Sequence, residues 1–319
     1  MNSSIIKSRL FPALAISAAL TLLAGCGTSA APEAASATGR TVDTVLGEVT
    51  VPADVDSVVV LEGRRDLDIV LALGLPLVGV PYEEEGSLDL KSPTADALAE
   101  SGASELFLAD EINLEAIAEA APALIVSRVD DVEPILDELQ AIAPVLAIGE
   151  QSVSTWQDDL RLVAEATGTE ERADELIAAY DARIAEVSAE YADVLANNTF
   201  APVGIDAEGS QTRPNRLLSS VLRDLGATPS AAFAESIEIN DGVEFGPEQL
   251  VSAFGDADAI IALVNDPAEW EAVQADALYQ QLPAVEAGHV VRSDKQTHEG
   301  ASLTAMHSID VIEALLKTF

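Results

Sequence analysis

The sequence predicts an α/β protein of two lobes joined by one long helix. Short apolar runs typical of buried parallel strands alternate with helical segments on both sides of the middle of the chain. Between them, apolar residues from Trp156 to Leu195 recur at steps of mostly three and four, which is the pattern of one helix face. A helix of that length exceeds what a small lobe needs, so we expect it to connect two lobes.

The first 25 residues are predicted to be an export signal. Lys7 and Arg9 precede an apolar run over 10–23, which is too short to span a membrane comfortably. Leu23-Ala24-Gly25-Cys26 is similar to the lipobox of bacterial lipoproteins, in which the cysteine carries lipid such as palmitate and becomes the N-terminus. We expect Cys26 to hold the chain at the outer face of the cell membrane; a plain secretory signal or a short membrane anchor is the alternative.

Composition limits the partners of the exported chain. Residues 26–40 are rich in small residues and are expected to form the lipidated cysteine and a flexible tether. Without Lys7 and Arg9, 14 basic residues stand against 55 acidic ones, a net charge of −41. Such a chain is not expected to bind nucleic acid, and it should contact the membrane through the lipid anchor only.

The first lobe is expected over residues 41–154. After a small hairpin around Leu46-Gly47, strands and helices alternate at the spacing of a mostly parallel sheet covered on both faces. The predicted strands are 58–61, 77–80, 106–108, 124–126 and 145–148, and the predicted helices are 66–73, 94–100, 114–120 with Asn113 as its N-cap, and 132–142. Ligands of such sheets bind beyond the carboxyl ends of the strands, where the loops carry Glu62-Gly63-Arg64-Arg65 and Ser127-Arg128.

The connecting segment, 155–196, is called the helical strut below. Gly168 suits the left-handed position after a helix, and Thr169 is a good cap for the next one. We therefore predict a helix over 155–167 and a long helix over about 170–195.

The second lobe is expected over residues 197–319. The predicted strands are 203–205, 259–264 and 289–291, the predicted helices are 216–225, 247–254, 267–281 and 302–317, and a polar loop covers 206–213. The lobes resemble each other in one detail: a short helix with glutamate as its second residue leads into a strand in both. These glutamates are Glu115 and Glu248.

The ordered set of segments resembles the substrate-binding lipoproteins of ABC importers for iron-siderophores, a group that includes cobalamin- and haem-binding proteins. The segments that carry the resemblance are TVLGEVTVP (44–52), VVVLEGRRDLDIVLALG (58–74), 76–80, NLEAIAEAAPALIV (113–126), LQAIAP (139–144), 156–180 and LPAVEAGHVV (282–291). The resemblance implies two Rossmann-like lobes bridged by one long helix, with the ligand in a cleft between them. One departure is that residues 296–300, before the last helix, lack the aromatic usual there.

This resemblance implies an extracytoplasmic binding protein, a monomer, that captures a ferric siderophore and delivers it to an ABC permease and its ATPase. Ferric siderophores are commonly anionic and already satisfy the iron, so arginine, which is permanently charged and donates in a fork, suits their oxygens. Five arginines fall in or beside loops at the ligand-facing strand ends: Arg64, Arg65, Arg128, Arg213 and Arg216. Alternatively, each offsets a nearby acid such as Glu62, Asp66, Asp130 or Asp206. Tyr82 and His298 are further candidate ligand contacts.

A direct metal site, a cofactor and a catalytic site are not expected. His289, His298 and His307 all lie in the last 31 residues, so a zinc or manganese site between the lobes would lack ligands from the first lobe. The sequence has no Gly-x-Ser-x-Gly elbow, phosphate loop or dinucleotide-binding glycine motif. A binding protein for haem, cobalamin or another metal chelate, and a lipid-anchored surface enzyme or sensor, remain alternatives.

The resemblance also implies that Glu115 and Glu248 pair with arginines of the permease, one from each lobe. On position alone, each glutamate could merely complement the dipole of its own helix.

Overall fold

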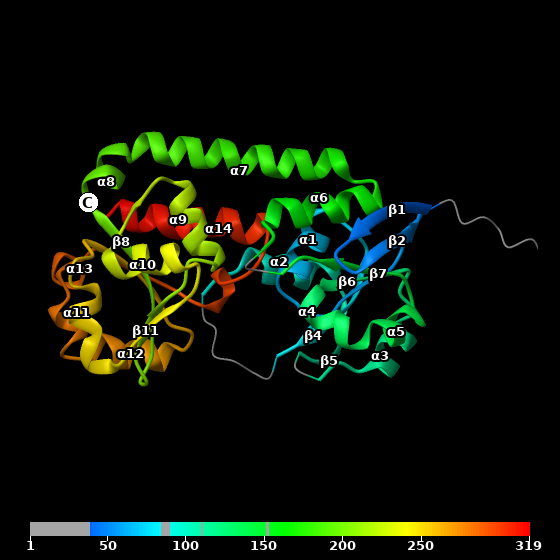
Figure 1. Ribbon diagram of the computed structural model, residues 1–319, viewed down its shortest axis with the longest axis horizontal. Helices are drawn as coiled ribbons and strands as arrows, with labels where there is room; N and C mark the ends of the chain where they lie inside the picture. The colour runs from blue at the N-terminus through cyan, green and yellow to red at the C-terminus, as the bar shows by residue number, and fades with distance from the viewer. Residues whose placement is uncertain (1–38, 84–89, 110, 151–152) are drawn as a thin grey trace, which may run out of the picture. The chain divides into compact units, whose positions relative to one another are not determined.

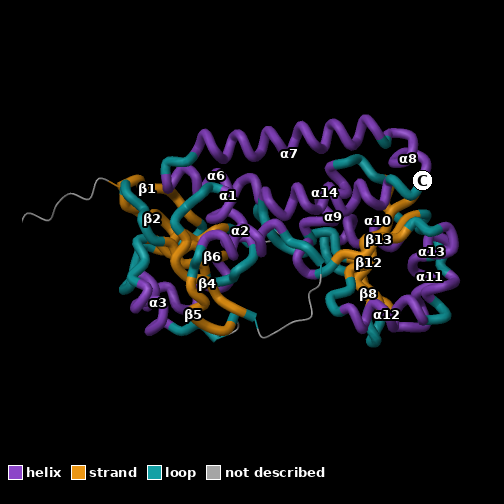
Figure 2. The backbone as a smooth tube through the Cα atoms, turned by 180° about the vertical axis from the view of Figure 1, so that it is seen from behind, coloured by secondary structure: helices purple, strands orange, loops and turns teal. Residues whose placement is uncertain are grey.

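The computed structural model describes residues 39–83, 90–109, 111–150 and 153–319 (Figure 1). The predicted export signal, Cys26 and the tether up to residue 38 lie outside the described residues. The described chain contains two separate α/β sheets and a long helix, as Figure 2 also shows from behind. The predicted fold class is confirmed. None of the helices in these ranges is both long and apolar enough to cross a membrane.

The first sheet is wholly parallel. Its five strands lie in the order β5-β4-β3-β6-β7, so the strand that comes first in the chain lies at the centre. These strands are β3 (Val58–Val60), β4 (Leu77–Tyr82), β5 (Ser104–Leu108), β6 (Leu124–Arg128) and β7 (Val145–Ile148). All three residues of β3 are fully buried, as expected for a strand covered on both faces.

Helices connect these strands. They are α1 (Arg65–Ala72), α2 (Pro93–Ser101), α3 (Leu114–Ala120), α4 (Val129–Val132), η1 (Glu133–Ile135) and α5 (Leu136–Gln140). The single helix predicted over 132–142 is wrong. Pro134 lies in the 3₁₀ turn η1 between two short helices, because proline has no N–H to continue an α-helix.

An antiparallel hairpin precedes this sheet. Strands β1 (Gly39–Thr44) and β2 (Gly47–Pro52) pair with Thr44 opposite Gly47, so the turn is Val45-Leu46 and not Leu46-Gly47 as predicted. The Thr44 hydroxyl accepts a hydrogen bond from the Leu46 N–H and donates one to the Gly47 carbonyl, which closes the turn.

The helical strut consists of α6 (Trp156–Thr167), α7 (Glu170–Glu190) and α8 (Ala192–Asn197). Gly168 has a positive φ of 76° and ends α6, as predicted. The long helix stops at Glu190 instead of reaching 195, because Tyr191 leaves helical geometry (φ −108°, ψ 24°) and the chain turns into α8, which buries Leu195. At 21 residues α7 is about 30 Å long.

The second sheet is mixed. Its main path is β11-β9-β8-β12-β13, with β10 (Thr228–Pro229) paired to β8. Strands β8 (Thr199–Ile205), β12 (Ala259–Leu263) and β13 (Val290–Ser293) are parallel, whereas β9 (Ser210–Thr212) and β11 (Val243–Phe245) are antiparallel additions. Strand β9 lies in the segment predicted as a polar loop, and β10 and β11 were not predicted.

The helices of the second lobe match the sequence prediction in part. They are α9 (Leu217–Asp224), α10 (Ala231–Ile239), η2 (Pro247–Gln249), α11 (Leu250–Phe254), α12 (Pro267–Ala275), η3 (Tyr279–Gln281), α13 (Pro283–Ala287), η4 (Lys295–Thr297) and α14 (Ser302–Leu316). Helices α10 and α13 were not predicted.

Helix α14 ties the lobes together. It packs against α9 and α7 and also against α1 and α2 of the first lobe. Asp68 of α1 is fully buried and accepts hydrogen bonds from the N–H groups of Ala301, Leu303 and Thr304, at the start of α14. These donors would otherwise lack partners at a helix N-terminus. The loop that leads into α14 is therefore fixed to the first lobe.

Candidate functional site

The loop after β3 is organised by one buried carboxylate. Asp66 accepts hydrogen bonds from five backbone N–H groups at 2.7 to 3.1 Å. Their donors are Leu61, Glu62, Gly63, Arg64 and Leu67. Burial raises the pKa of Asp66 to about 6, against the lowering effect of these donors, so it is ionised at neutral pH. The loop thus holds Glu62 and Arg64 in fixed positions.

Arg128 stands at the carboxyl end of β6, next to that loop. Its guanidinium Nε lies 2.8 Å from Oε1 of Glu62, and its side chain is 14% exposed. Parallel pairing of β3 and β6 brings their carboxyl ends to the same edge of the sheet. The first lobe therefore offers two arginines, Arg64 and Arg128, at this edge.

Glu299 approaches the same point from the loop before α14. Besides the Asp68 bonds at Ala301, this loop is held by a hydrogen bond of 2.8 Å from the Leu217 N–H to the His298 carbonyl. The Glu299 side chain is only 6% exposed. Its backbone is thus attached to elements of both lobes.

Three arginines surround the Glu299 carboxylate. Arg64 Nη1 and Arg128 Nη2 of the first lobe lie 3.5 and 3.4 Å from Oε2, and Arg216 Nη1, just before α9, lies 3.6 Å from Oε1. Arg64, Arg128, Arg216, Glu299 and Glu62 together form the arginine cluster. A second contact between the lobes is the ion pair of Lys295 with Glu83.

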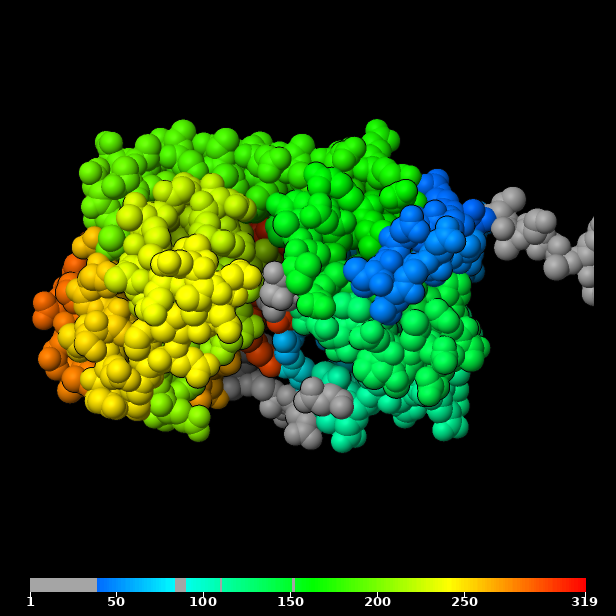
Figure 3. Space-filling view, viewed as in Figure 1, coloured from blue at the N-terminus to red at the C-terminus, as the bar shows by residue number. Residues whose placement is uncertain are grey.

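Two hollows meet at the arginine cluster. The larger, of about 410 Å³, is lined by Arg128, Arg213 and Arg216 together with Asp130, Glu150 and Glu299. The smaller, of about 190 Å³, is lined by Arg64, Glu83, Lys295 and Gln296 and again by Glu299. The space-filling view in Figure 3 shows the recess between the two lobes. Glu299 thus lines both hollows, and each of them contains cationic side chains.

Burial and charge set the protonation of this cluster. Burial, followed by the charge of Asp66, raises the pKa of Glu62 to about 9, so Glu62 is protonated at neutral pH. Although burial acts against it, the hydrogen bond with Glu62 and the charges of the three arginines lower the pKa of Glu299. Burial, helped by Arg216, lowers the pKa of His298 to about 3. At neutral pH the arginine cluster therefore holds three cations, one carboxylate and one neutral carboxyl.

Four of the five predicted arginines lie at these hollows. Arg64, Arg128 and Arg216 belong to the arginine cluster, and Arg213 lines the larger hollow while it pairs with Glu244 at 2.7 Å. Arg65 does not. Its guanidinium is buried and pairs with Asp159 of α6 at 2.7 Å, so it joins the first lobe to the strut instead of facing a ligand.

The other two candidate contacts are less well placed. Tyr82 is 41% exposed at the end of β4, and neither hollow has it in its lining. His298 is half-buried and also absent from both linings. In contrast, Glu62, Glu299 and Lys295 were not predicted as site residues. Glu62 could have been found from its place in the same loop as Arg64, but the position of Glu299 depends on Asp68, 231 residues earlier in the chain.

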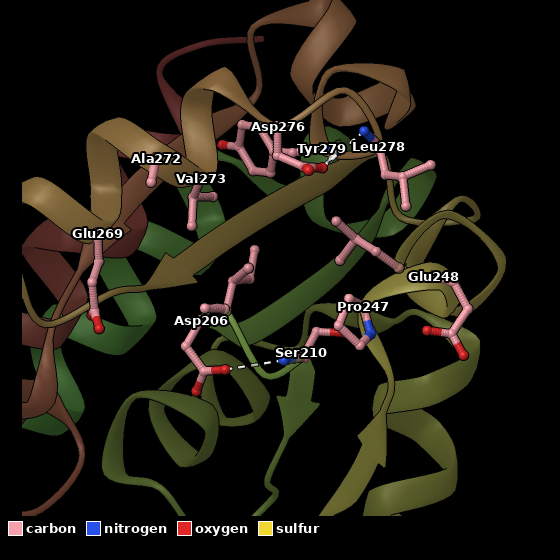
Figure 4. Close-up of a pocket in the computed structure, with 14 residues that line it drawn as sticks. Asp206, Ser210, Pro247, Glu248, Glu269, Ala272, Val273, Asp276, Leu278 and Tyr279 are labelled. Atoms are coloured by element: carbon pink, nitrogen blue, oxygen red, sulfur yellow. Dashed lines mark hydrogen bonds between the residues drawn. The ribbon is translucent and has the colours of Figure 1, made fainter.

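Glu115 and Glu248 are both exposed and are the second residues of α3 and η2, as predicted. Figure 4 shows Glu248 at the rim of a third cavity, of about 470 Å³, within the second lobe. Apolar side chains such as Val273 and Leu278 line this cavity, and further carboxylates, Asp206, Glu269 and Asp276, lie around it. In the part of the chain that the structure describes, no group of three or more His, Cys, Asp or Glu side chains is placed to hold a metal ion.

The sequence profile of the periplasmic binding proteins matches residues 58–297, which include both sheets. The chain belongs to the periplasmic binding protein family. Its relatives in this family include YfiY of Bacillus subtilis, a probable siderophore-binding lipoprotein, which is 32% identical over 181 residues. That alignment covers 55% of this chain and 54% of the relative, so it spans about half of each.

Solved structures of periplasmic binding proteins agree with the two-lobed fold. The siderophore periplasmic binding protein from the fuscachelin gene cluster of Thermobifida fusca is 30% identical, with a TM-score of 0.68, over 83% of this chain and 98% of that one. The triscatecholate siderophore binding protein FeuA of Bacillus subtilis, complexed with ferri-bacillibactin, gives a TM-score of 0.72 over 87% of this chain and 98% of that one. At 17% identity, this second likeness shows the fold alone.

Proposed function

We propose that this periplasmic binding protein captures an anionic ferric siderophore in the recess between its lobes and delivers it to an ABC permease. The observation that carries the proposal is the convergence of Arg64 and Arg128 from one lobe with Arg216 from the other. Arginines donate to the oxygens of a ferric complex without replacing them at the iron. The relatives named above, which are described as siderophore-binding proteins, support the same ligand class.

A fluorescence titration of the chain from Thr41 onward tests this proposal. The ligand panel contains ferric triscatecholate, ferric trihydroxamate and ferric citrate, with haem and cobalamin as alternatives. We expect saturable binding of an anionic ferric complex, and loss of most of that affinity when Arg64, Arg128 and Arg216 are all changed to glutamine. Equal affinity in the folded triple variant would contradict the placement of the binding site at these arginines. Selective binding of haem or cobalamin would show that the ligand belongs to that class instead.

Delivery is proposed to use Glu115 and Glu248. Each is exposed on its own lobe, and two charged contacts that engage together strengthen docking far more than either contact alone. Changing both to alanine should leave the affinity for the ferric complex unchanged and sharply reduce both uptake and stimulation of the importer's ATPase. Normal uptake by this double variant would mean that the two carboxylates only complement their helix dipoles.

Anchoring is proposed to use Cys26. Cys26→Ser should release the protein into the medium of cells with a single membrane, which a blot of culture supernatants measures. Retention of the variant at the membrane would contradict lipid attachment there.

A further inference from the structure

Glu299 places a negative charge at the centre of the site where the proposed ligand brings its own. Its carboxylate lies 3.4 to 3.6 Å from a nitrogen of each arginine in the arginine cluster. These separations exceed those of well-formed charge-assisted hydrogen bonds, which are about 2.7 to 2.9 Å. Glu299 therefore compensates three cations without using the hydrogen-bonding capacity of any one of them fully.

The backbone on both sides of this carboxylate is held in place. The N–H of Ala301, two residues on, donates to the buried Asp68, and the carbonyl of His298 accepts from Leu217. The side chain itself is 6% exposed and lines both hollows. A ligand that reaches the arginines must accordingly come into contact with Glu299.

Glu62 gives Glu299 a means to lose its charge without moving. Both carboxyl groups lie against the Arg128 guanidinium, Glu62 Oε1 at 2.8 Å from Nε and Glu299 Oε2 at 3.4 Å from Nη2. Burial raises the pKa of Glu62 to about 9, so in the ligand-free protein the pair holds one proton, on Glu62. When the anionic groups of the ligand bind the guanidinium groups, these cations no longer stabilise the charge of Glu299. The negative charges of the ligand and of Glu299 then repel each other. Uptake of a second proton by the pair removes that repulsion.

We infer that Glu299 acts as an internal counter-anion that determines the ligand charge accepted by this site, and that the Glu62–Glu299 pair takes up a proton when an anionic chelate binds. This inference rests on the proposed function, because it concerns the same recess. Glu299 is thereby a specificity-determining residue. At high pH its charge disfavours multiply charged anionic ligands more than weakly charged ones. As pH falls and the pair takes up its proton, the affinity for anionic ligands increases.

The groups that face Glu299 from the surrounding elements are Glu62 and Arg64 after β3, Arg128 at the end of β6, Asp131 in α4, Arg216 before α9 and its neighbour His298. The arginines stay charged at all relevant pH values. His298 has a pKa of about 3 and stays neutral, so the carboxyl groups are the ones able to titrate. Burial also raises the pKa of Asp66, which adjoins Glu62, and of Asp131, which lies near Arg128, so their protons must be distinguished from that of the pair. Protons that these two aspartates take up should persist in Glu299→Gln.

Calorimetry with ferric triscatecholate tests the inference between pH 6 and 8. Each titration is repeated in buffers of different ionisation enthalpy, which counts the protons taken up. For the wild-type protein we expect an uptake of up to one proton and an affinity that rises by up to tenfold per pH unit as pH falls. Glu299→Gln should bind the same complex at least tenfold more tightly at pH 8 and lose the proton uptake of the pair. Because the wild-type protein and the variant are titrated with the same ligand, protons bound by the ligand itself cancel in the difference between them.

Glu150→Gln is the matched control. Glu150 lines the larger hollow, and its substitution changes the net charge by the same amount. Among the described ion pairs, those of Arg64, Arg128 and Arg216 do not include Glu150. A neutral ferric trihydroxamate is the second control, and its affinity should be nearly independent of Glu299. Equal gains in Glu150→Gln and Glu299→Gln, weaker binding in Glu299→Gln, or unchanged proton uptake would overturn the inference while leaving siderophore binding intact. Failure of every ferric complex to bind would instead overturn the proposed function.

Discussion

The loops that follow β3 and β8 occupy equivalent places in the two lobes, yet they are held very differently. After β3, the fully buried Asp66 accepts five backbone N–H groups. After β8, Asp206 is exposed and accepts two, from Glu208 and Gly209. The same residue type after the same kind of strand therefore makes a rigid, buried support in one lobe and an exposed turn in the other.

The difference extends to the arginines that each lobe contributes. Arg128 is 14% exposed and stands directly at the end of a buried parallel strand, whereas Arg213 is 37% exposed and follows the short antiparallel strand β9. Ordering a mobile side chain on binding costs conformational entropy, which a preorganised side chain has already lost on folding. Arg128 is thus expected to supply more of the binding free energy for an anionic ligand than Arg213.

The largest expected effect is on stability and comes from Asp66→Asn. The single oxygen of an amide cannot accept hydrogen bonds from all five N–H groups, and the amide NH₂ would point at other donors. Some buried N–H groups are then left without a partner. We expect a loss on the order of 3 kcal/mol in the free energy of unfolding, measured by urea denaturation. A loss below about 1 kcal/mol would show that this loop does not depend on its carboxylate.

The next effect concerns affinity and compares Arg128→Gln with Arg213→Gln. A hydrogen bond to a charged group contributes about 1.5 to 3 kcal/mol, so loss of Arg128 should weaken ferric triscatecholate binding at least tenfold. Arg213 is more exposed and already paired with Glu244, and its loss should cost less than about 1 kcal/mol. Fluorescence titration measures both, and a larger loss in the Arg213 variant would contradict the greater importance of Arg128.

An effect that is small per pH unit is expected for Glu62→Gln. The folded protein holds a proton on Glu62 up to about pH 9, whereas in the unfolded chain the group ionises near its ordinary value of 4.5. The folded state therefore binds the extra proton between these pH values, and the Glu62 contribution to stability decreases as pH rises, by at most about 1.4 kcal/mol per pH unit.

Unfolding curves of the wild-type protein and Glu62→Gln, recorded from pH 5 to 9, check this sign. The stability of the variant relative to the wild type should increase with pH. A constant or decreasing difference would mean that Glu62 is ionised in the folded protein.

The smallest effect is expected for Asp206→Asn, the counterpart of the Asp66 substitution. Because its two N–H partners lie in an exposed turn where water can replace the carboxylate, the change should cost less than about 1 kcal/mol and leave ligand affinity unchanged. Urea denaturation of both aspartate variants under the same conditions provides the comparison, and equal losses would remove the distinction between the two loops.

The sequence allowed the first lobe to be predicted more fully than the second for a physical reason. The inner strand β3 there is buried on both faces and appears as a continuous apolar run, Val58–Val60, and β7 is a similar run. Strands β9 and β11 are three residues long, and β9 lies in a polar segment, so no comparable run marks them. The end of α7 at Glu190 was missed because the apolar spacing continues through Tyr191 into α8.

The site was predictable only in its residue types. Arginines at strand ends indicated an anion site, but Arg64 and Arg65 are adjacent and only Arg64 faces the recess. Arg65 is directed by Asp159, which is 94 residues away in the chain, and Glu299 is placed through Asp68. Such pairs depend on tertiary packing, which local spacing does not reveal.

The bond between Asp68 and the start of α14 also affects the order in which this chain can fold. Asp68 is synthesised more than 200 residues before the backbone groups that satisfy it. A buried carboxylate without its donors is strongly unfavourable, so the first lobe cannot complete its packing around α1 while residues 301–304 are missing. A nascent chain is thereby kept from reaching its final compact state until residues 301–304 have been synthesised.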